Sequence, residues 1–549
     1  MFNMIDQRLP QRYWTWALCM LMSALCIALL PIHIIWAWPA ALFVCLSLVG
    51  LADYAQTAQA IRRNYPVLAH FRFFFEFIRP EIRQYFIEAD TDELPFSRAQ
   101  RAIVYQRAKG VSDKRPFGTQ LNVYQSDYEW INHSIAPTDI ASHDFRLTIG
   151  ANCAQPYSAS IFNISAMSFG ALSANAILSL NAGAKRGNFY HDTGEGSISC
   201  HHKKNGGDIV WEIGSGYFGC RNTDGTFNAE KFAENAAGSQ VQMIELKLSQ
   251  GAKPGHGGVL PGAKVSVEIA EARGVPFGID CVSPAKHSAF TTPIELLEFV
   301  SRLRALSGGK PVGIKLAVGH PWEWFALCKA MIKTNITPDF IVVDGGEGGT
   351  GAAPLEFTDH VGAPLREALM LVHNSLVGVG LRERIKIGAS GKIVTAFDIA
   401  RTLATGADWC NSARGFMFAL GCLQAQTCHT GHCPTGVTTQ DPQRMRALVV
   451  PEKSDRVFQF HQNTMKALKE LLAAAGLNHP AELRPEHVIR RVSSTEVRSL
   501  AALHVWAKPG ELLSGIPDHP VFKVFWAEAS ADSFAAPSSV SALYASKTS

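Results

Sequence analysis

Hydrophobic residues follow two distinct patterns along this chain, and the change falls near Arg146. From Tyr13 to Ala52 there is no Asp, Glu, Lys or Arg, and about 20 apolar residues suffice for one membrane-spanning helix. After Arg146, short runs rich in Val and Ile are each closed by a Gly-rich turn and followed by a helical pattern. The pattern predicts an apolar N-terminal segment and a large α/β body.

The apolar segment is long enough for two membrane spans joined near Pro31, with Trp36 and Trp38 at interfacial depth. Basic residues flank the segment but are absent from the tip: Arg8, Arg12, Arg62 and Arg63. The positive-inside rule then predicts a two-span membrane anchor with both ends and the catalytic body in the cytoplasm. A signal peptide is disfavoured because the apolar run far exceeds its usual length. A buried core hairpin of a soluble protein is the other alternative.

The rhythm after Arg146 is typical of a TIM (β/α)8 barrel of about 250 residues. Eight strands are predicted: Ile161–Phe169, Asn188–Asp192, Met243–Leu248, Pro276–Cys281, Val312–Leu316, Phe340–Asp344, Ile385–Gly388 and Trp409–Ala413. Residues 197–240 would be an insertion between the second and third strands. We expect five regions: a transmembrane hairpin (1–54), a helical or irregular linker packing on the barrel (55–145), the barrel with a cysteine loop (146–445), a helical extension (446–529) and a flexible Ala/Ser-rich tail (530–549).

Two loops, at residues 388–392 and 411–415, follow the seventh and eighth predicted strands. In such barrels these loops commonly bind a phosphate group through backbone N–H groups. Gly388 and Gly391 would let the backbone approach an anion closely, and Arg414, between Ala413 and Gly415, offers a charged fork. Ordinary strand-to-helix turns are the alternative.

Cys422, Cys428 and Cys433 lie within twelve residues directly after the second loop. Three thiolates this close can converge on one iron–sulfur cluster, of a three-iron type or with a fourth ligand from elsewhere. The spacing fits no common zinc pattern, although His429 and His432 leave zinc open. Buried structural cysteines are the other alternative. A cluster beside a phosphate site would indicate redox chemistry with a nucleotide-type cofactor.

Composition narrows the functional classes. The 549 residues, with 45 Gly and 28 Pro, are enough for one large α/β domain with appendages. The formal net charge is +4 and no basic block with interleaved aromatics occurs, so we expect no nucleic-acid partner. Twelve cysteines in so long a chain do not form a disulfide scaffold, and a reducing compartment fits better.

Three long motifs, in this order, resemble the FMN-binding synthase domain of the glutamate synthase family. They are Lys-Leu-Ser-Gln-Gly-Ala-Lys-Pro-Gly-His-Gly-Gly-Val-Leu-Pro-Gly at 247–262, Asp-Gly-Gly-Glu-Gly-Gly-Thr-Gly-Ala-Ala-Pro at 344–354, and the cysteine loop through Pro442. Residues 166–173, 194–196 and 215–219 resemble the same domain, and the resemblance spans about residues 162–476. It implies a TIM barrel that holds FMN against a 3Fe-4S cluster and reduces the 2-iminoglutarate formed from 2-oxoglutarate and ammonia.

The resemblance also implies roles for single residues. Lys247 matches the family position beside the flavin, where reduced FMN carries negative charge, and Gln250 is its neighbour. Lys253 matches a lysine that grips the substrate carboxylate or carbonyl. Glu195 matches a glutamate that positions the amine or exchanges its proton, with hydrogen bonding to its own turn as the alternative.

Further strand-end residues are expected to contact the flavin. Ala166 and Ser168 would touch the isoalloxazine through their backbone, and Lys315 would be a second cation. The ribityl chain would lie against Gly345, Gly346, Gly348 and Asp344, although Asp344 can instead cap a turn.

The chain also departs from the family pattern. It opens with an apolar segment instead of an amidotransferase domain, and about seventy residues follow Gly476 where the family has a long β-helix, so we expect no glutamine-derived ammonia. His256 replaces the usual Glu of the 247–262 motif, and Lys286 and His287 are predicted near the substrate mouth.

Three functional hypotheses follow. The first is a membrane-tethered FMN and iron–sulfur oxidoreductase that reduces an imine of a 2-oxo acid to an amino acid. Because no dinucleotide-binding fingerprint appears, we expect an electron-donor protein or a quinone to supply its electrons. The second runs the same site backwards, as an amino- or hydroxy-acid dehydrogenase that passes electrons to a membrane acceptor. The third is a non-catalytic membrane scaffold. A homo-oligomer is compatible with all three.

Overall fold

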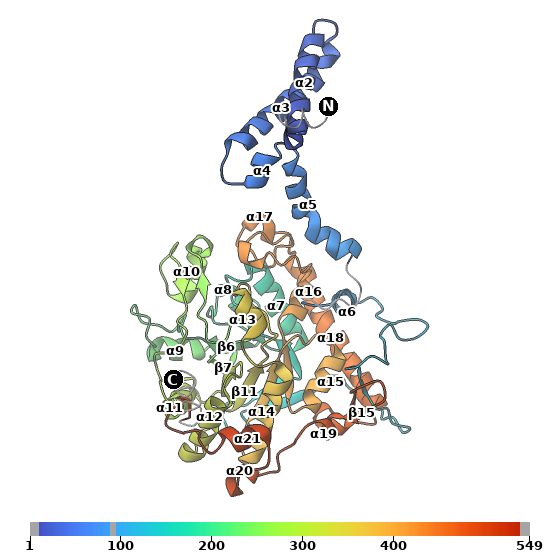
Figure 1. The fold of residues 1–549 in the computed structure, drawn as a ribbon. Coiled ribbons are helices and arrows are strands. Elements are labelled where there is room, and N and C mark those ends of the chain that lie inside the picture. The colour runs from blue at the N-terminus through green and yellow to red at the C-terminus, as the bar shows by residue number, and fades with distance from the viewer. Residues whose placement is uncertain (1–9, 88–94, 538–549) are drawn as a thin grey trace, which may run out of the picture. The chain divides into compact units, whose positions relative to one another are not determined.

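The structure is a computed structural model that describes residues 10–87 and 95–537. The chain forms two compact units, Met1–Asp92 and Glu93–Ser549. The first contains the predicted hairpin and the second contains the barrel (Figure 1).

The first unit is built around the antiparallel helices α2 (Trp14–Leu29) and α3 (Ala37–Ala55), which a short turn joins. The indole of Trp16 lies over Gly50, where any side chain would clash with it, and donates a hydrogen bond to the Ser47 carbonyl at 3.0 Å. The short helix α4 (Ala60–Asn64) and the amphipathic α5 (Ala69–Ile82) follow. Buried Asp53 at the end of α3 accepts hydrogen bonds from Val67 N–H (3.0 Å) and His70 Nε2 (2.8 Å), which fixes the start of α5.

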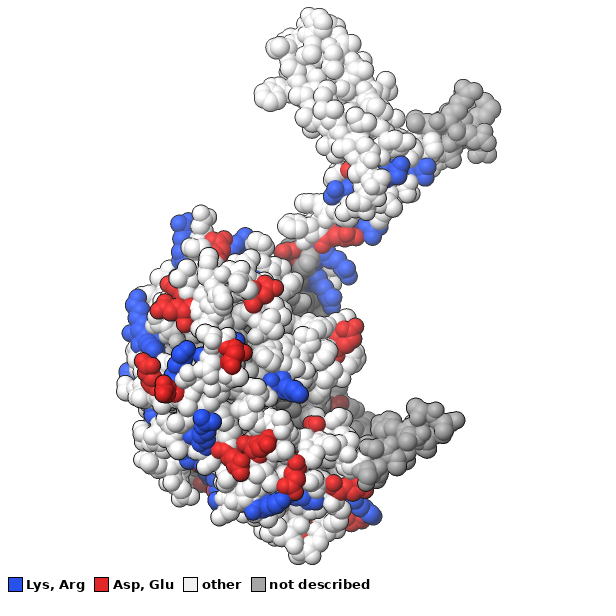
Figure 2. All heavy atoms as spheres, turned by 90° about the vertical axis from the view of Figure 1, so that its left-hand side faces the viewer, with Lys and Arg blue, Asp and Glu red and all other residues white. Residues whose placement is uncertain are grey.

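Both hairpin helices are long and apolar enough to cross a membrane. The segments Gln11–Leu29 and Ile34–Ala55 have mean hydropathies of 1.4 and 2.2. Figure 2 shows this hairpin as a surface almost free of charged groups, with blue atoms gathered at the end opposite its tip. A signal sequence meets the same criteria of length and composition. Arg8, one of the predicted flanking charges, lies outside the described residues.

The second unit confirms the predicted TIM barrel. Its eight parallel strands close in the order β10-β11-β12-β13-β4-β5-β6-β7. Their bounds are β4 (Phe162–Ile164), β5 (His191–Asp192), β6 (Ile209–Ile213), β7 (Val241–Lys247), β10 (Val312–Leu316), β11 (Phe340–Asp344), β12 (Lys386–Ser390) and β13 (Trp409–Ser412). Closure pairs β13 with β4 through Cys410↔Phe162, Asn411↔Asn163 and Ser412↔Ile164.

One strand prediction and the predicted insertion are wrong. The third barrel strand is Ile209–Ile213, which is buried at every position and lies inside the stretch predicted as an insertion. Residues Pro276–Cys281 form no barrel strand, because Phe277 and Ile279 are exposed and Cys281 pairs instead with Leu260 in the hairpin of β8 (Val259–Leu260) and β9 (Cys281–Val282). The long insertion therefore follows the fourth strand, and Lys247 closes strand four rather than strand three.

Helices surround the barrel, as the βα rhythm predicts. They are α7 (Ala174–Gly187), α9 (Ala229–Ala236), α11 (Pro293–Leu306), α12 (Pro321–Thr334), α14 (Leu365–Gly378), α15 (Ala396–Ala404) and α16 (Arg414–Leu420). Shorter helices lie in the loops: α8 (Cys200–Lys203), α10 (Val267–Arg273), α13 (Leu355–His360) and α17 (Pro442–Met445). Side chains of Ser173, Thr292 and Thr395 cap the N-termini of α7, α11 and α15.

Segments from both sides of the barrel sequence complete the unit. The long α18 (Val450–Ala474) packs against α7 and against α6 (Arg98–Ala108). One small sheet joins β1 (Glu129–Ile131), β14 (Val488–Arg491) and β15 (Val497–Ser499), and another joins β2 (Arg146–Ile149) and β3 (Tyr157–Ser160). The chain continues through α19 (Leu500–Leu503), α20 (Glu511–Ser514) and α21 (Pro520–Phe525). Within the predicted tail, Asp532 forms an ion pair with Lys333 at 2.7 Å, and residues 538–549 lie outside the described residues.

Candidate active site

Charged side chains gather where the barrel strands end, which is the face that carries the active site in TIM barrels. Lys247 is the last residue of β7, Lys315 the fourth of β10, Glu212 the fourth of β6 and Asp344 the last of β11. All four are buried. The sequence predicted Lys247, Lys315 and Asp344 here, and the structure adds Glu212.

Lys247 and Glu195 form the central ion pair of this face. Lys247 Nζ donates to Glu195 Oε2 at 2.7 Å and to Gln250 Oε1 at 3.0 Å. Glu195 lies in the loop after β5, and Gly214, directly after β6, leaves the space that the glutamate side chain occupies. Burial opposes ionisation of Glu195, but the Lys247 ammonium outweighs it and brings the pKa of the carboxyl down to about 2. Both predicted residues are therefore charged at neutral pH.

The same contacts act on Lys247 itself. Burial opposes its charge, yet Glu195 and Glu212 outweigh burial and raise the pKa of the lysine. Glu212 Oε1 lies 3.6 Å from Lys247 Nζ and Glu212 Oε2 lies 2.7 Å from Lys315 Nζ. Glu212 thus joins the two predicted lysines.

Lys253 lies across the small gap above Gly258. A Cβ atom at Gly258 would be 3.3 Å from both Lys253 Nζ and Glu195 Oε1. Burial lowers the pKa of Lys253, with a partly compensating contribution from Glu195. The glycine therefore leaves an opening between a carboxylate and a second ammonium group, which suits a ligand that carries a carboxylate or carbonyl oxygen.

His287 contacts the backbone of Lys247 and the hydroxyl of Tyr217. Its Nε2 lies 2.8 Å from the Lys247 carbonyl and its Nδ1 lies 3.1 Å from the Tyr217 hydroxyl. The ring is buried, and burial lowers its pKa to about 4. Sequence reasoning placed His287 near the substrate mouth, whereas the structure shows a neutral positioning residue under β7; Lys286 is exposed.

Close backbone approaches form the floor of the mouth. A Cβ at Gly194 would lie 2.7 Å from the backbone nitrogen of Ser168, and one at Gly251 would lie 2.0 Å from the Gly345 carbonyl oxygen. These glycines bring the loop after β5 onto predicted Ser168 and the loop after β7 onto predicted Gly345. The loop after β4 that holds Ala166 lies on the same face.

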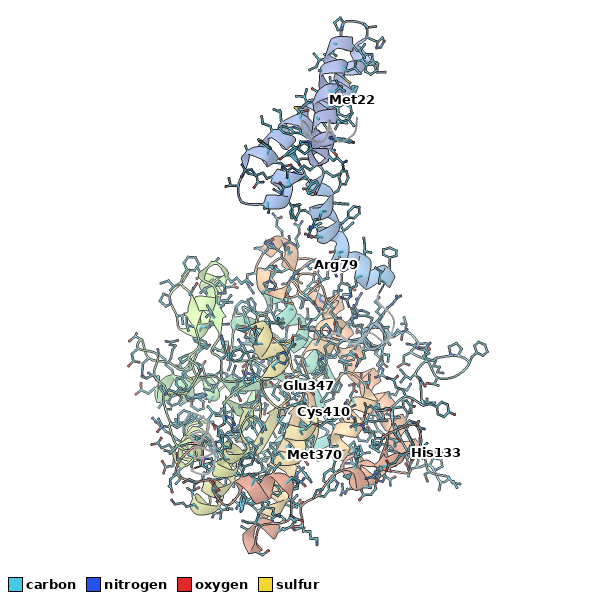
Figure 3. The ribbon with its side chains drawn as sticks, viewed as in Figure 1. Met22, Arg79, His133, Glu347, Met370 and Cys410 are labelled. Atoms are coloured by element: carbon cyan, nitrogen blue, oxygen red, sulfur yellow. The ribbon has the colours of Figure 1, made fainter. Side chains whose placement is uncertain are left out.

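Asp344 holds two of these loops together. Its Oδ2 accepts Gly251 N–H at 2.9 Å and its Oδ1 accepts Ser390 Oγ–H at 2.8 Å. Gly345, Gly346 and Gly348 follow it, and Gly346 N–H donates to the Ala363 carbonyl at 2.8 Å. Glu347, labelled in Figure 3, accepts Leu365 N–H at 2.9 Å at the start of α14. Asp344 therefore caps backbone groups here, which is the alternative that its sequence context left open.

The two predicted phosphate loops end neighbouring strands β12 and β13. Arg414 is the first residue of α16 and is half-buried, and no hydrogen bond or ion pair of its side chain appears among the described residues. Its guanidinium lies 4.0 Å from the Cβ position of Gly349. An unpaired Arg at a helix N-terminus, flanked by Ala413, can bind an anion.

The glycines of these loops differ in role. Gly391 lies after the end of β12. Gly388 lies within β12, where a Cβ would be 2.5 Å from the Trp409 ring, so its lack of a side chain serves packing inside the barrel. Gly415 likewise makes room for Ser412 Oγ at 2.5 Å.

The three predicted cysteines line one cavity, together with Met417 and Val437. Burial raises the pKa of the Cys422 thiol, and Cys428 and Cys433 raise it further. Burial of Cys433 is outweighed by hydrogen bonds from Thr435 and Thr438, which lower its pKa to about 7. No disulfide joins any of these cysteines.

The cysteine loop contacts the loop after β4. Gln440 Nε2 donates to the carbonyls of Gly170 and Leu172 at 3.0 Å each, and Ser173 N–H donates to the Val437 carbonyl at 2.9 Å. The thiol cavity therefore borders the segment that contains predicted Ala166 and Ser168.

Sequence reasoning missed three buried carboxyl groups: Asp192, Glu212 and Glu245. A signal was present, because alternate residues of a strand share one face and Glu245 is two residues before Lys247. A glutamate on the lysine's own face of a buried strand indicates a charge network inside the barrel.

Comparisons with known proteins agree on one family. A family model described as the conserved region in glutamate synthase matches residues 139–478. The glutamate synthase large subunit-like protein YerD of Bacillus subtilis is 39% identical over 484 residues, which cover 81% of this chain and 92% of that protein. The archaeal glutamate synthase (NADPH) of Methanocaldococcus jannaschii is 38% identical over 322 residues, 58% of this chain and 60% of that protein.

Solved structures are more distant. A flavocytochrome b2 mutant with pyruvate bound has a TM-score of 0.39 at 12% identity and covers 82% of this chain and 91% of its own. A mandelate oxidase mutant with an FMN adduct has a TM-score of 0.40 at 12% identity, over 73% of this chain and 92% of its own.

Proposed function

This chain belongs to the glutamate synthase family, and from that premise we propose that it is a membrane-tethered FMN and iron–sulfur oxidoreductase that reduces an imine of a 2-oxo acid to an amino acid. The preferred substrate would be similar to 2-oxoglutarate. Relatives of this chain carry the name glutamate synthase (NADPH), and the chain spans about 60% of the archaeal ones. Activity and substrate are therefore proposals for this chain.

One observation carries the proposal. The Lys247–Glu195 pair, the half-buried Lys253 and the unpaired Arg414 lie on the strand-end face of one closed barrel, and the three-thiol cavity borders that face. A cation beside a flavin, a cation for a substrate carboxylate and thiolates for a cluster are the groups that this chemistry needs.

The residues present fit FMN. Arg414 and the backbone after β12 and β13 would hold the phosphate. Gly251 and Gly345 approach each other closely, so no side chain lies between their two loops. The ribityl chain and the flavin ring would lie on these loops. Bound FMN would supply a hydride to the substrate carbon.

This chain's own side chains would orient the substrate. Lys253 would bind a carboxylate oxygen of the 2-oxo acid across the gap at Gly258. Glu195, ionised at neutral pH, would accept a hydrogen bond from the imine nitrogen. Lys247, kept charged by Glu195 and Glu212, would place positive charge at the flavin's pyrimidine edge.

The thiol cavity also fits its expected group. Cys422, Cys428 and Cys433 would ligate a 3Fe-4S cluster, which supplies one-electron carrier capacity. The low pKa of Cys433 favours the thiolate that a metal requires.

The direct test supplies 2-oxoglutarate, ammonium and a chemical reductant to the purified full-length protein and measures glutamate by mass spectrometry. We expect glutamate formation that Lys253→Ala reduces about 100-fold, in line with the loss of a positioned polar contact in a site. Exposed Lys286→Ala is the matched control and should leave the rate unchanged. A flavin-loaded protein that forms no amino acid from a panel of 2-oxo acids contradicts the proposal.

The apolar hairpin favours a second candidate, in which the same site oxidises an amino or hydroxy acid and passes electrons to a membrane acceptor. Mixing the oxidised protein with amino and hydroxy acids in the absence of oxygen distinguishes the two. Bleaching of the flavin absorption that a quinone analogue then reverses would favour oxidation over imine reduction.

A further inference from the structure

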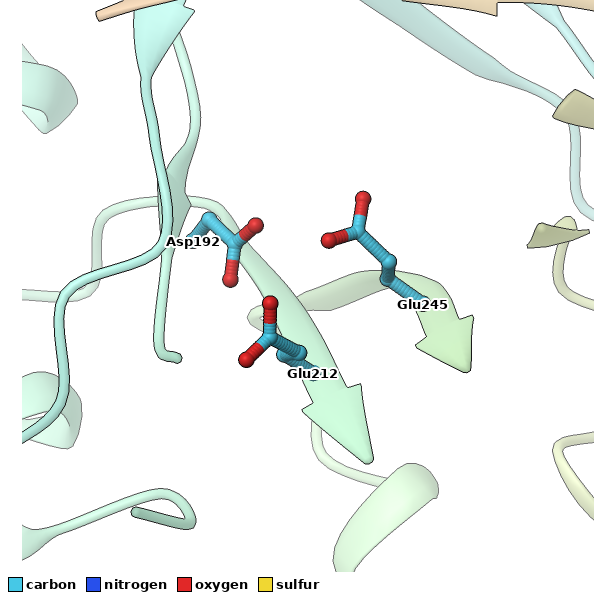
Figure 4. A group of neighbouring side chains, drawn as sticks. All are labelled: Asp192, Glu212 and Glu245. Atoms are coloured by element: carbon cyan, nitrogen blue, oxygen red, sulfur yellow. The ribbon is translucent and has the colours of Figure 1, made fainter. Parts of the chain in front are cut away.

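Three carboxyl side chains meet inside the barrel beneath the Lys247–Glu195 pair. Asp192 ends β5, Glu212 lies in β6 and Glu245 lies in β7, so they come from three neighbouring strands, and Figure 4 shows their carboxyl groups turned toward one another. Their ligand atoms lie within 4.8 Å, and each residue is at most 2% exposed. Charges this deep need compensation.

The cation position in this group belongs to a lysine. Lys315 Nζ lies 2.7 Å from Glu212 Oε2 and 3.7 Å from Glu245 Oε1. Burial opposes the charge of Lys315, but the three carboxylates, together with Asp344, outweigh it and raise the pKa of that lysine well above its usual value. An ammonium group is therefore already seated where a metal ion would bind.

The charges still do not balance. Asp192, Glu212 and Glu245 are three carboxyl groups that face two ammonium groups, Lys247 and Lys315, whereas Glu195 is also balanced by Lys253 and Arg273. An uncompensated carboxylate in a low-dielectric interior is costly enough that such groups take up a proton instead. The geometry alone thus calls for at least one protonated carboxyl.

Asp192 and Glu245 are the pair that holds it. A carboxyl oxygen of Asp192 lies within 4.8 Å of one of Glu245, and two negative charges this close in a buried site are so costly that the pair shares a proton. Gly194 N–H donates to Asp192 Oδ1 at 3.0 Å, whereas Glu245 Oε1 has no donor within hydrogen-bond distance. Burial raises the pKa of Asp192 to about 7, and burial together with Asp192 raises that of Glu245 well above its usual value.

The groups that face the pair come from every neighbouring strand. Tyr190 beside β5, Glu212 on β6 and Lys315 on β10 act on the pair directly, while Lys247 on β7 and Asp344 on β11 act on it through Glu212 and Lys315. Glu212 connects the buried carboxyl groups to the mouth of the barrel, because it contacts both Lys315 and Lys247. Lys247 in turn reaches Glu195 at the mouth.

We propose that Asp192 and Glu245 store one proton beneath the active site and return it to Lys247 through Glu212 when Lys247 passes a proton through Glu195 to the substrate nitrogen. This inference rests on the proposed function for its turnover step. The O–H bond of the pair breaks, the proton moves to the Glu212 carboxylate and then to Lys247 Nζ, and the new N–H bond replaces the one that Lys247 gave through Glu195 to the substrate nitrogen. No electrons move in these steps, and a proton from solvent that enters by the same groups reloads the pair after product release.

The stored proton is tested without turnover. Infrared spectra of the purified full-length protein in H2O and D2O at neutral pH should contain the carbonyl stretch of a buried protonated carboxyl. That band should disappear in Glu245→Gln and in Asp192→Asn, whose amides preserve size and hydrogen bonding. Glu129→Gln is the matched control, because Glu129 is another buried carboxyl but is paired with Arg366 and Arg401. A band that is absent from the unaltered protein, or that survives in both variants, overturns the proposal.

The return path is tested by the pH profile of turnover. In the unaltered protein the rate should fall as the pH rises past the point where the pair loses its last proton, and the raised pKa values of Asp192 and Glu245 place that point far above the usual range of a carboxyl group. Glu245→Gln should lower kcat about tenfold, leave KM unchanged and flatten that fall, which a packing defect would not do. If the band behaves as expected but the pH profile is unchanged in Glu245→Gln, the return path is wrong. If the band is present and no 2-oxo acid reacts, the proposed function fails and the proton store stands.

Discussion

At the scale of single residues, the Lys247–Glu195 contact decides the electrostatics of the mouth. Both side chains are mostly removed from water, and each shifts the pKa of the other toward the charged form. Removing one partner of a buried pair is more harmful than removing both, because the remaining charge loses its compensation.

A double-mutant cycle tests this coupling. Lys247→Met should lower the free energy of unfolding by about 3 to 5 kcal/mol at pH 7, because Glu195 is left without its partner. Glu195→Gln added to Lys247→Met should restore part of that loss. Chemical denaturation of the flavin-free protein measures both, and equal stability of the single and double variants would contradict the coupling.

His287 makes a second residue-scale prediction. Its folded-state pKa of about 4 lies below the ordinary value of 6.5, so the unfolded chain binds a proton between these pH values and the folded protein does not. The contribution of His287 to stability is therefore complete above pH 6.5 and is lost as the pH falls toward 4. Relative to His287→Asn, the free energy of unfolding should fall by up to about 3 kcal/mol over this window.

Sequence reasoning identified the mouth residues better than the layer beneath them. The Lys-x5-Lys spacing indicated Lys247 and Lys253 because both lie in a long specific motif. Glu245 and Glu212 lie in apolar strands, where a single carboxyl gives no sign of its partners. Only the barrel register, which aligns Glu245 with Glu212 across β6 and β7, brings them together.

At the scale of elements, a segment predicted as an insertion is a barrel strand, and a segment predicted as a barrel strand is not one. Ile209–Ile213 carries Trp211 and Glu212, which break a simple Val/Ile run, yet every position is buried. Pro276–Cys281 has the alternating apolar pattern of a strand but exposes Phe277 and Ile279. Short apolar runs do not reveal which neighbours they will have, and the register of the whole sheet decides.

The cysteine loop is an element whose function one substitution tests. Cys428→Ser should remove the broad iron–sulfur absorption and leave the flavin bands, because the loop borders the barrel but its thiols lie in a separate cavity. Cys200→Ser, an exposed cysteine on α8, should leave both absorptions intact. Iron and sulfide analysis of the same samples measures the loss, and a full cluster signal in Cys428→Ser would refute the ligand set.

At the scale of the whole molecule, the chain joins a catalytic unit to an apolar helical hairpin. The barrel unit has its own continuous core, and the hairpin exposes large apolar side chains along both helices, among them Leu21 and Leu48. Burial in lipid would remove this apolar surface from water. We therefore propose that the hairpin anchors the enzyme, which would place its substrate turnover beside a membrane pool of electron carriers.

Fractionation tests the anchor. The unaltered chain should remain with membranes after high-salt and alkaline washes. Leu21→Arg with Leu48→Arg should release it, because each Arg near a span centre costs about 2.5 to 3.5 kcal/mol on insertion scales. Val505→Arg, at an exposed apolar position of the catalytic unit, is the matched control. Recovery of the unaltered protein in the soluble fraction, with an N-terminus that begins after the first helix, would instead identify this segment as a cleaved signal sequence.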